Sequence, residues 1–211
     1  MSNRLQSHFF WGPHAPLSAL TGAGLLIMAS VRMAYAILCA GCLVWVFGLC
    51  AIVFYSAKKI LPKKGRALVV LFLSSLFCSL YILLTGFLNP LLVTGAWFFL
   101  VLVPPCCMGS GFFHGLDNEE TAGILAGVFA ETACLGLLIM AVSLIREPLG
   151  LGSLSFPGGV WGIYEFFSME KNGAGFLPIR VLSVSAGGFL ILGFGIALFR
   201  HLRIGQSGDK S

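Results

Sequence analysis

Two adjacent cysteines, Cys106 and Cys107, directly follow a double proline within an apolar stretch. Proline removes a backbone donor and leaves a carbonyl unpaired, so a helix breaks here. A thiolate in unwound backbone is a good ligand for a soft metal or an iron–sulfur cluster. His14 lies beside a similar break and is a second candidate ligand, since histidine replaces cysteine on some clusters. Alternatively, the cysteines only fill space and His14 is interfacial.

A second candidate for chemistry is Glu131, which interrupts a long apolar run. A carboxylate within a membrane span is costly and usually faces an ion path or a partner. We therefore expect Glu131 to attract Na⁺ or to carry a proton, the alternative being a structural hydrogen bond to a neighbouring helix. Cys39 and Cys42 have the spacing of a redox pair. Helical spacing alone also places two small residues on one face, and this interpretation is favoured.

The composition identifies the surroundings in which these residues work. Of 211 residues, 58% are hydrophobic and 10% are charged, whereas a soluble domain carries about 25% charged residues. A core cannot absorb this excess of apolar side chains, which therefore face lipid. The composition excludes a soluble enzyme and a nucleic-acid-binding module. At about 20 residues per crossing, the chain has room for roughly six spans.

The apolar runs predict an all-α membrane protein with six transmembrane helices, at residues 5–30, 33–55, 67–88, 91–113, 121–145 and 179–199. Five of the 13 basic residues lie between 58 and 66, and the positive-inside rule places this loop in the cytoplasm. Both termini are then cytoplasmic, and the long loop 146–180 lies outside. Arg32 and Arg146 stand at span ends, where we expect them to extend toward the lipid head groups.

Spans one and four share an interruption by proline and glycine, and each begins a group of three spans. An odd number of spans per group forces opposite orientations, the inverted repeat known from transport proteins. We therefore predict a single membrane domain over 1–211, with one repeat at about 5–88 and the other at about 91–200. We also expect the first and fourth helices to be broken at mid-membrane. The alternative is two proline kinks that form no site.

Four segments resemble a known family. Residues Leu144 to Phe156, beginning Leu-Ile-Arg-Glu, resemble the I-R-E-x-L-G-x-G-T-L-F signature after the fifth span of the Rnf and Nqr small membrane subunits. Residues 16–21 are similar to their C-P-L-L-A-V-T, 58–63 to R-R-F-I-P-K, and 186–189 to P-G-A-F. The matches follow in order over nearly the whole chain. The cytoplasmic basic loop is most similar to the E subunit of Rnf, or the D subunit of Nqr.

The resemblance implies a subunit of an ion-translocating electron-transport complex in the bacterial inner membrane. Such a complex couples oxidation of ferredoxin or NADH to export of Na⁺ or H⁺. The implied partners are a homologous, oppositely oriented membrane subunit and further flavin and iron–sulfur subunits. The chain alone is not expected to be catalytic. Its role would be to carry electrons across the membrane, or to support the path that carries them.

The resemblance also implies a [2Fe–2S] cluster shared between two subunits, with one cysteine from each helix break. The family's first cysteine aligns with Ala15 and its second with Pro105, so Cys106 and Cys107 follow directly after the expected position. The family's acidic residue in span five aligns with Gly127, one helical turn before Glu131. The cluster is therefore expected either to use a neighbouring ligand or to be lost from this chain.

Two other functions fit the same residues. A small secondary transporter would explain the inverted repeat, the broken helices and Glu131. A structural membrane subunit would need neither a cofactor nor an ion path. Uptake of a solute by the chain alone would identify the transporter. Substitution of Cys106, Cys107 and Glu131 without loss of the activity of the complex would identify the structural subunit.

Overall fold

The computed structural model describes residues 27–57, 66–109, 121–158, 162–168, 180–184, 186–195 and 197. This part of the chain is mostly helical. Three of its helices are long and apolar enough to cross a membrane, namely Met33–Phe54, Leu68–Leu88 and Thr132–Leu151. Their number and composition are those of a multi-pass membrane protein. The six-span inverted repeat stays a prediction, and the first predicted break and His14 lie outside the described residues.

The elements follow in a simple order along the chain. They are the short 3-10 helix η1 (Met28–Val31), helices α3 (Met33–Ala57), α4 (Arg66–Leu88), α5 (Pro90–Val101), α6 (Val103–Gly109) and α8 (Thr121–Leu151), strands β1 (Ser153–Pro157) and β2 (Ile163–Ser168), and helix α9 (Arg180–Ser183). An apolar helix, Ala186–Gly195, follows α9. Helices α3 and α4 confirm that the predicted segments 33–55 and 67–88 are helical, and both are long and apolar enough to cross a membrane.

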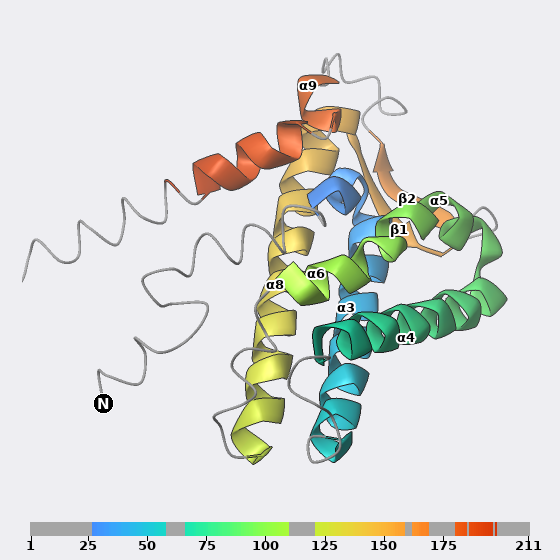
Figure 1. The fold of residues 1–211 in the computed structure, drawn as a ribbon. Coiled ribbons are helices and arrows are strands. Elements are labelled where there is room, and N and C mark those ends of the chain that lie inside the picture. The colour runs from blue at the N-terminus through green and yellow to red at the C-terminus, as the bar shows by residue number, and fades with distance from the viewer. Residues whose placement is uncertain are drawn as a thin grey trace, which may run out of the picture.

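Helices α3 and α8 form the centre of the fold and lie side by side, while α4 and α5 lie across α3 (Figure 1). Small residues allow the close approach of α3 and α8. A Cβ on Gly136 of α8 would lie 3.2 Å from the Cβ of Ala40 on α3, so a larger side chain there would separate the two helices. The arrangement gives α3 neighbours on two sides.

The main core lies between α3 and the helices that cross it. Helix α4 contributes a narrow buried stripe, Val70, Ser74 and Cys78, at the four-residue spacing that keeps side chains on one helix face. Much of the rest of α4 is exposed, including Phe72 and Phe87. Large apolar side chains on such a surface suit a lipid environment rather than water.

The fourth predicted span is interrupted at a single residue slightly before the double proline, but Leu102 keeps a helical backbone conformation and its carbonyl accepts from the Cys106 N–H at 3.3 Å. Helix α5 ends at Val101 and α6 begins at Val103, with Leu102 between them. The two prolines therefore occupy the first turn of α6, where a missing N–H leaves no hydrogen bond unmade. The turn is closed by the Leu102 N–H, which donates to the Phe99 carbonyl at 3.2 Å.

The fifth and sixth predicted spans need correction at the same end of the molecule. Helix α8 continues past the expected end at 145 to Leu151, with Pro148 inside it. The sixth span is not one uninterrupted helix, because a bend at Val184 separates α9 from the helix at Ala186–Gly195. The corner is tight, since a Cβ on Gly187 would overlap the backbone of Leu182.

The loop after α8 begins with a β-hairpin. Strands β1 and β2 pair antiparallel, with an irregularity between Leu154 and Ser155. Gly162 has φ +79°, and a Cβ there would meet the backbone N of Leu92 at 2.7 Å. Only glycine combines that backbone conformation with so close an approach. The hairpin is thereby held against the start of α5, which covers one end of the core.

Candidate functional site

Of the candidate cluster ligands and the candidate ion-path residue, namely Cys106, Cys107, His14 and Glu131, only Cys106 has a described side chain. It lies in α6 and is 2% exposed. Cys107 and Glu131 lie in α6 and α8, but their side chains are outside the described part of the structure, as is the whole of His14. The proposed roles of these three residues therefore stay predictions.

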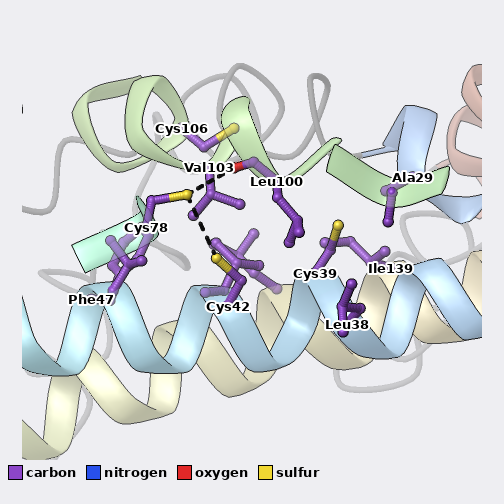
Figure 2. Packing of buried hydrophobic residues seen from close by; sticks show 14 of the residues in the cluster. Ala29, Leu38, Cys39, Cys42, Phe47, Cys78, Leu100, Val103, Cys106 and Ile139 are labelled. Carbon is purple, nitrogen blue, oxygen red and sulfur yellow. Dashed lines mark hydrogen bonds between the residues drawn. The ribbon is translucent and has the colours of Figure 1, made fainter. Parts of the chain in front are cut away.

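Cys106 belongs to a group of buried thiols in one core, and the sequence did not predict that they meet. The thiol group consists of Cys39 and Cys42 from α3, Cys78 from α4 and Cys106 from α6 (Figure 2). Residues 39 and 42 share a face of α3 because they are three positions apart. Cys78 belongs to the buried stripe of α4, and Cys106 of α6 is buried in the same core.

The closest contact in the thiol group joins Cys42 and Cys78, whose Sγ atoms lie 4.0 Å apart (Figure 2). The Cys78 thiol also donates to the Leu100 carbonyl at 3.2 Å, in the last turn of α5. One sulfur thus contacts both α3 and the end of the broken span. These contacts are weak ones for buried polar atoms, because a thiol is a poor donor and a poor acceptor.

The described residues do not fit a [2Fe–2S] cluster shared across a subunit surface. Such a cluster needs ligands that face the partner, whereas Cys106 is buried by its own chain. Within the ranges the structure describes, no group of three or more His, Cys, Asp or Glu is arranged to hold a metal ion. A ligand role for Cys107 or His14 is untouched by these observations and stays a prediction.

The structure reveals a second buried group, around Arg146, that sequence reasoning placed wrongly. Arg146 does not extend to the head groups but is fully buried. Its guanidinium donates to the Leu182 carbonyl at 2.7 Å, the Ser183 carbonyl at 3.1 Å, the Ile27 carbonyl at 3.2 Å and the Ser30 Oγ at 2.9 Å. By contrast, Arg32 is half-buried.

The partners of Arg146 explain why a buried guanidinium is tolerated. The last carbonyls of a helix lack intrahelical partners, and a basic side chain can donate to them at this negative end. Leu182 and Ser183 are the last residues of α9. Arg146 therefore caps α9 and also holds the residue before η1, so three separate parts of the chain meet on one side chain.

The neighbouring acid, Glu147, caps the other kind of helix end, the N-terminal end of α3. Glu147 is 1% exposed, and its Oε2 accepts from the N–H of Met33 at 2.7 Å, at the start of α3. A carboxylate is favoured at this positive end of a helix. Its Oε1 and the buried Ser143 Oγ, one turn earlier on α8, have no hydrogen-bond partner within the described residues. We call Arg146, Glu147 and Ser30 the Arg146 anchor.

Glycines let the chain close around the anchor. A Cβ on Gly188 would lie 2.6 Å from Cγ2 of Ile27 and 3.1 Å from Nη1 of Arg146. A Cβ on Gly150 would lie 2.9 Å from the backbone N of Ser183. The signal available in the sequence was the Arg-Glu pair itself, but its burial depends on segments far away along the chain.

An open apolar groove of about 790 Å³ runs between α3 and α8. Its lining includes Ala40, Gly48 and Gly136, and among the lining residues only Thr132 and Trp45 carry a polar side-chain atom. A polar solute needs several convergent polar groups to replace its water. The groove therefore offers no site for such a solute within the described part of the chain.

Comparison with known proteins finds no matching family model and no matching curated protein. The resemblance to the Rnf and Nqr small membrane subunits therefore rests on the quoted segments alone.

Proposed function

We propose that the chain is a membrane subunit of an Rnf-like electron-transport complex that moves Na⁺ or H⁺ across the bacterial inner membrane. Both termini would be cytoplasmic, as the basic residues between 58 and 66 suggest. Its partners would be a homologous, oppositely oriented subunit and the flavin and iron–sulfur subunits of the complex. We further propose that this chain supports the electron path through its fold and does not use Cys106 as a cluster ligand.

The observation that supports this proposal most is the meeting of two family-like segments. The signature at 144–156 contains Arg146, and the segment at 186–189 contains Gly188. These residues are 42 positions apart in sequence, yet they are neighbours in the fold, because a Cβ on Gly188 would lie 3.1 Å from the Arg146 guanidinium. The family carries alanine at this position of P-G-A-F, so the contact supports the meeting of the two segments and not the residue at 188. Segments that resemble one family and also pack on each other are better support than isolated resemblances.

The supporting role follows from what the anchor holds. Through Ile27, Arg146 fixes the residue that precedes η1, at the end of the first predicted span. Through Leu182 and Ser183, it fixes the start of the last one. Holding these two segments in place is the structural role that we propose for the chain within the complex. The inward orientation of Cys106 favours this role over direct ligation.

Purification from native membranes in a mild detergent tests the proposal. The tagged chain is isolated, its partners are identified by mass spectrometry, and iron and flavin are assayed in the same sample. We expect redox subunits to co-purify with the wild-type chain and with an Arg32→Met control, and to be lost from an Arg146→Met variant. Isolation of a folded chain without redox partners would overturn the proposal. Solute uptake by vesicles holding only this chain would instead identify a secondary transporter.

A further inference from the structure

The β1–β2 hairpin exposes aromatic side chains that its contacts with the core do not use. Phe156 and Tyr164 stand opposite each other in the strand pairing, so their side chains lie side by side on one face of the hairpin. The next pair, Ser155 and Glu165, points to the other face, and Ser155 is buried. Phe156, Tyr164 and the nearby Phe166 are exposed. We call these three residues the hairpin aromatic patch.

The hairpin lies where two candidate membrane spans end. The candidate span Thr132–Leu151 ends two residues before Ser153, the first residue of β1. The far end of the hairpin is held at Gly162, where a Cβ would lie 2.7 Å from the backbone N of Leu92. Leu92 follows four residues after the candidate span Leu68–Leu88, at the start of α5. The hairpin therefore connects the end of one span with the end of another (Figure 1).

The third candidate span, Met33–Phe54, begins at the same end of the molecule. Glu147, near the end of α8, accepts from the N–H of Met33, so the start of α3 lies beside the end of α8. Strand β1 contacts both helices. Because the ends of helices that cross a membrane lie at its surface, a hairpin surrounded by three such ends lies at one membrane surface. The basic loop between residues 58 and 66 follows the opposite end of α3 and belongs to the other surface.

Lipid is the occupant that this position and composition favour. Leu88 at the end of α4 is exposed, and so is Leu91 of α5, next to the contact made by Gly162. The hairpin aromatic patch thus extends the apolar surface of the spans. Aromatic side chains, tyrosine among them, concentrate at the level of the lipid head groups, where the ring is buried and the hydroxyl stays hydrated. In water, the same exposed rings would be unfavourable.

We propose that the hairpin aromatic patch lies in the lipid–water interface and attaches the hairpin to phospholipid over the ends of α4 and α8. The hydroxyl of Tyr164 faces the head groups, and the rings of Phe156 and Phe166 contact the upper part of the acyl chains. The loop after α8 is then held by lipid as well as by the contact at Gly162. This surface requires only that the chain spans a membrane, and it does not depend on the proposed electron-transport function.

Hydroxyl-radical footprinting of the wild-type chain in native membranes tests the position of the patch. Phe72 of α4 is the internal reference, because it is 72% exposed in the fold, against 73% for Phe166, and lies within a candidate span. Radicals generated in water oxidise the rings that water reaches, and mass spectrometry measures the oxidation at each residue. We expect Phe166 to be oxidised as little as Phe72. Oxidation of Phe166 far above that of Phe72 would overturn the proposal.

Photo-crosslinking in the same membranes identifies what covers the patch. The photoreactive residue benzoylphenylalanine is placed at position 164 or, as the matched control, at position 165 on the other face of the hairpin. We expect phospholipid adducts from position 164 and far fewer from position 165. Adducts of position 164 with another protein would overturn the proposal and assign the patch to a partner subunit. Equal lipid adducts from both positions would also overturn it, because the aromatic face would then have no preference for lipid.

Discussion

The Arg146 anchor and the thiol group are both buried, and both join parts of the chain that are distant in sequence, but they do so in opposite ways. The guanidinium of Arg146 makes four hydrogen bonds, to three carbonyls and one hydroxyl. The thiol group relies on apolar packing, one thiol–carbonyl bond and one thiol–thiol contact. The Arg146 anchor is held by strong polar contacts, and the thiol group is held by close packing of its side chains.

This difference follows from the cost of burial. Removing a charged group from water is expensive unless hydrogen bonds replace its hydration, so each partner of Arg146 must be in place. A thiol behaves as a small apolar side chain and is buried at little cost. The anchor is therefore expected to matter more for stability than the thiol group. Four substitutions test this contrast.

Arg146→Met should have the largest effect. It removes the buried guanidinium that donates to the carbonyls of Leu182, Ser183 and Ile27, of which Ile27 keeps the Ser30 hydroxyl as a donor. Since each lost bond to a charged group is worth about 1.5–3 kcal/mol, we expect a loss of at least about 3 kcal/mol in unfolding free energy. Denaturant unfolding in detergent, followed by tryptophan fluorescence, measures it. Arg146→Lys keeps the charge but not the planar guanidinium, so its unfolding free energy should lie between those of the wild type and Arg146→Met. A loss below about 1 kcal/mol would contradict the anchor.

Gly188→Ala should have the next largest effect. The added Cβ would meet Ile27 at 2.6 Å and the Arg146 guanidinium at 3.1 Å. Such overpacking lowers the unfolding free energy by about 1–3 kcal/mol. Gly193→Ala is the control in the same helix, because nothing lies within 4 Å of the added Cβ. The control should be neutral or slightly stabilising. Equal thermal stability of both variants would show that the approach at Gly188 is not tight.

Glu147 tests the other half of the anchor. Glu147→Leu removes the acceptor of the Met33 N–H and should cost about 1–2 kcal/mol. Glu147→Gln keeps a carbonyl oxygen for that N–H and should recover most of the stability. The comparison is made by thermal unfolding of both variants in one detergent. Equal losses in Leu and Gln would assign the effect to the charge rather than to the cap.

The thiol group should show the smallest effect. Cys78→Ala removes one weak bond to the Leu100 carbonyl, the contact with the Cys42 thiol and a small volume from the core, so a loss of about 1 kcal/mol is expected. Cys134→Ala is the control, because Cys134 is exposed on α8, and it should change nothing measurable. A Cys78→Ala variant that loses as much stability as Arg146→Met would remove the contrast between the two regions.

The sequence predicted the local elements better than their contacts. Periodic apolar runs place α3 and α4, and proline chemistry places the break before Cys106 to within a few residues. The burial of Arg146 was mispredicted, because a basic residue at the end of an apolar run normally reaches the head groups. Its partners Ile27 and Leu182 are supplied only by the folded chain.

The thiol group illustrates the same limit. Cys42 and Cys78 are 36 positions apart, and nothing in the spacing of either one indicates the other. Their contact depends on how α4 crosses α3, which is a property of packing rather than of pattern (Figure 1). The sequence selected Cys106 for its proline neighbours but did not indicate that it faces its own core.

The iron content of the native complex, compared between the wild-type chain and Cys106→Ser, tests most directly whether this subunit acts through its fold. Both forms are purified with their partners from native membranes, and iron is measured per chain. We predict the same partners and the same iron in both, because Cys106 is buried by its own chain. Iron that falls in Cys106→Ser while the partners remain would show that Cys106 is a cluster ligand after all.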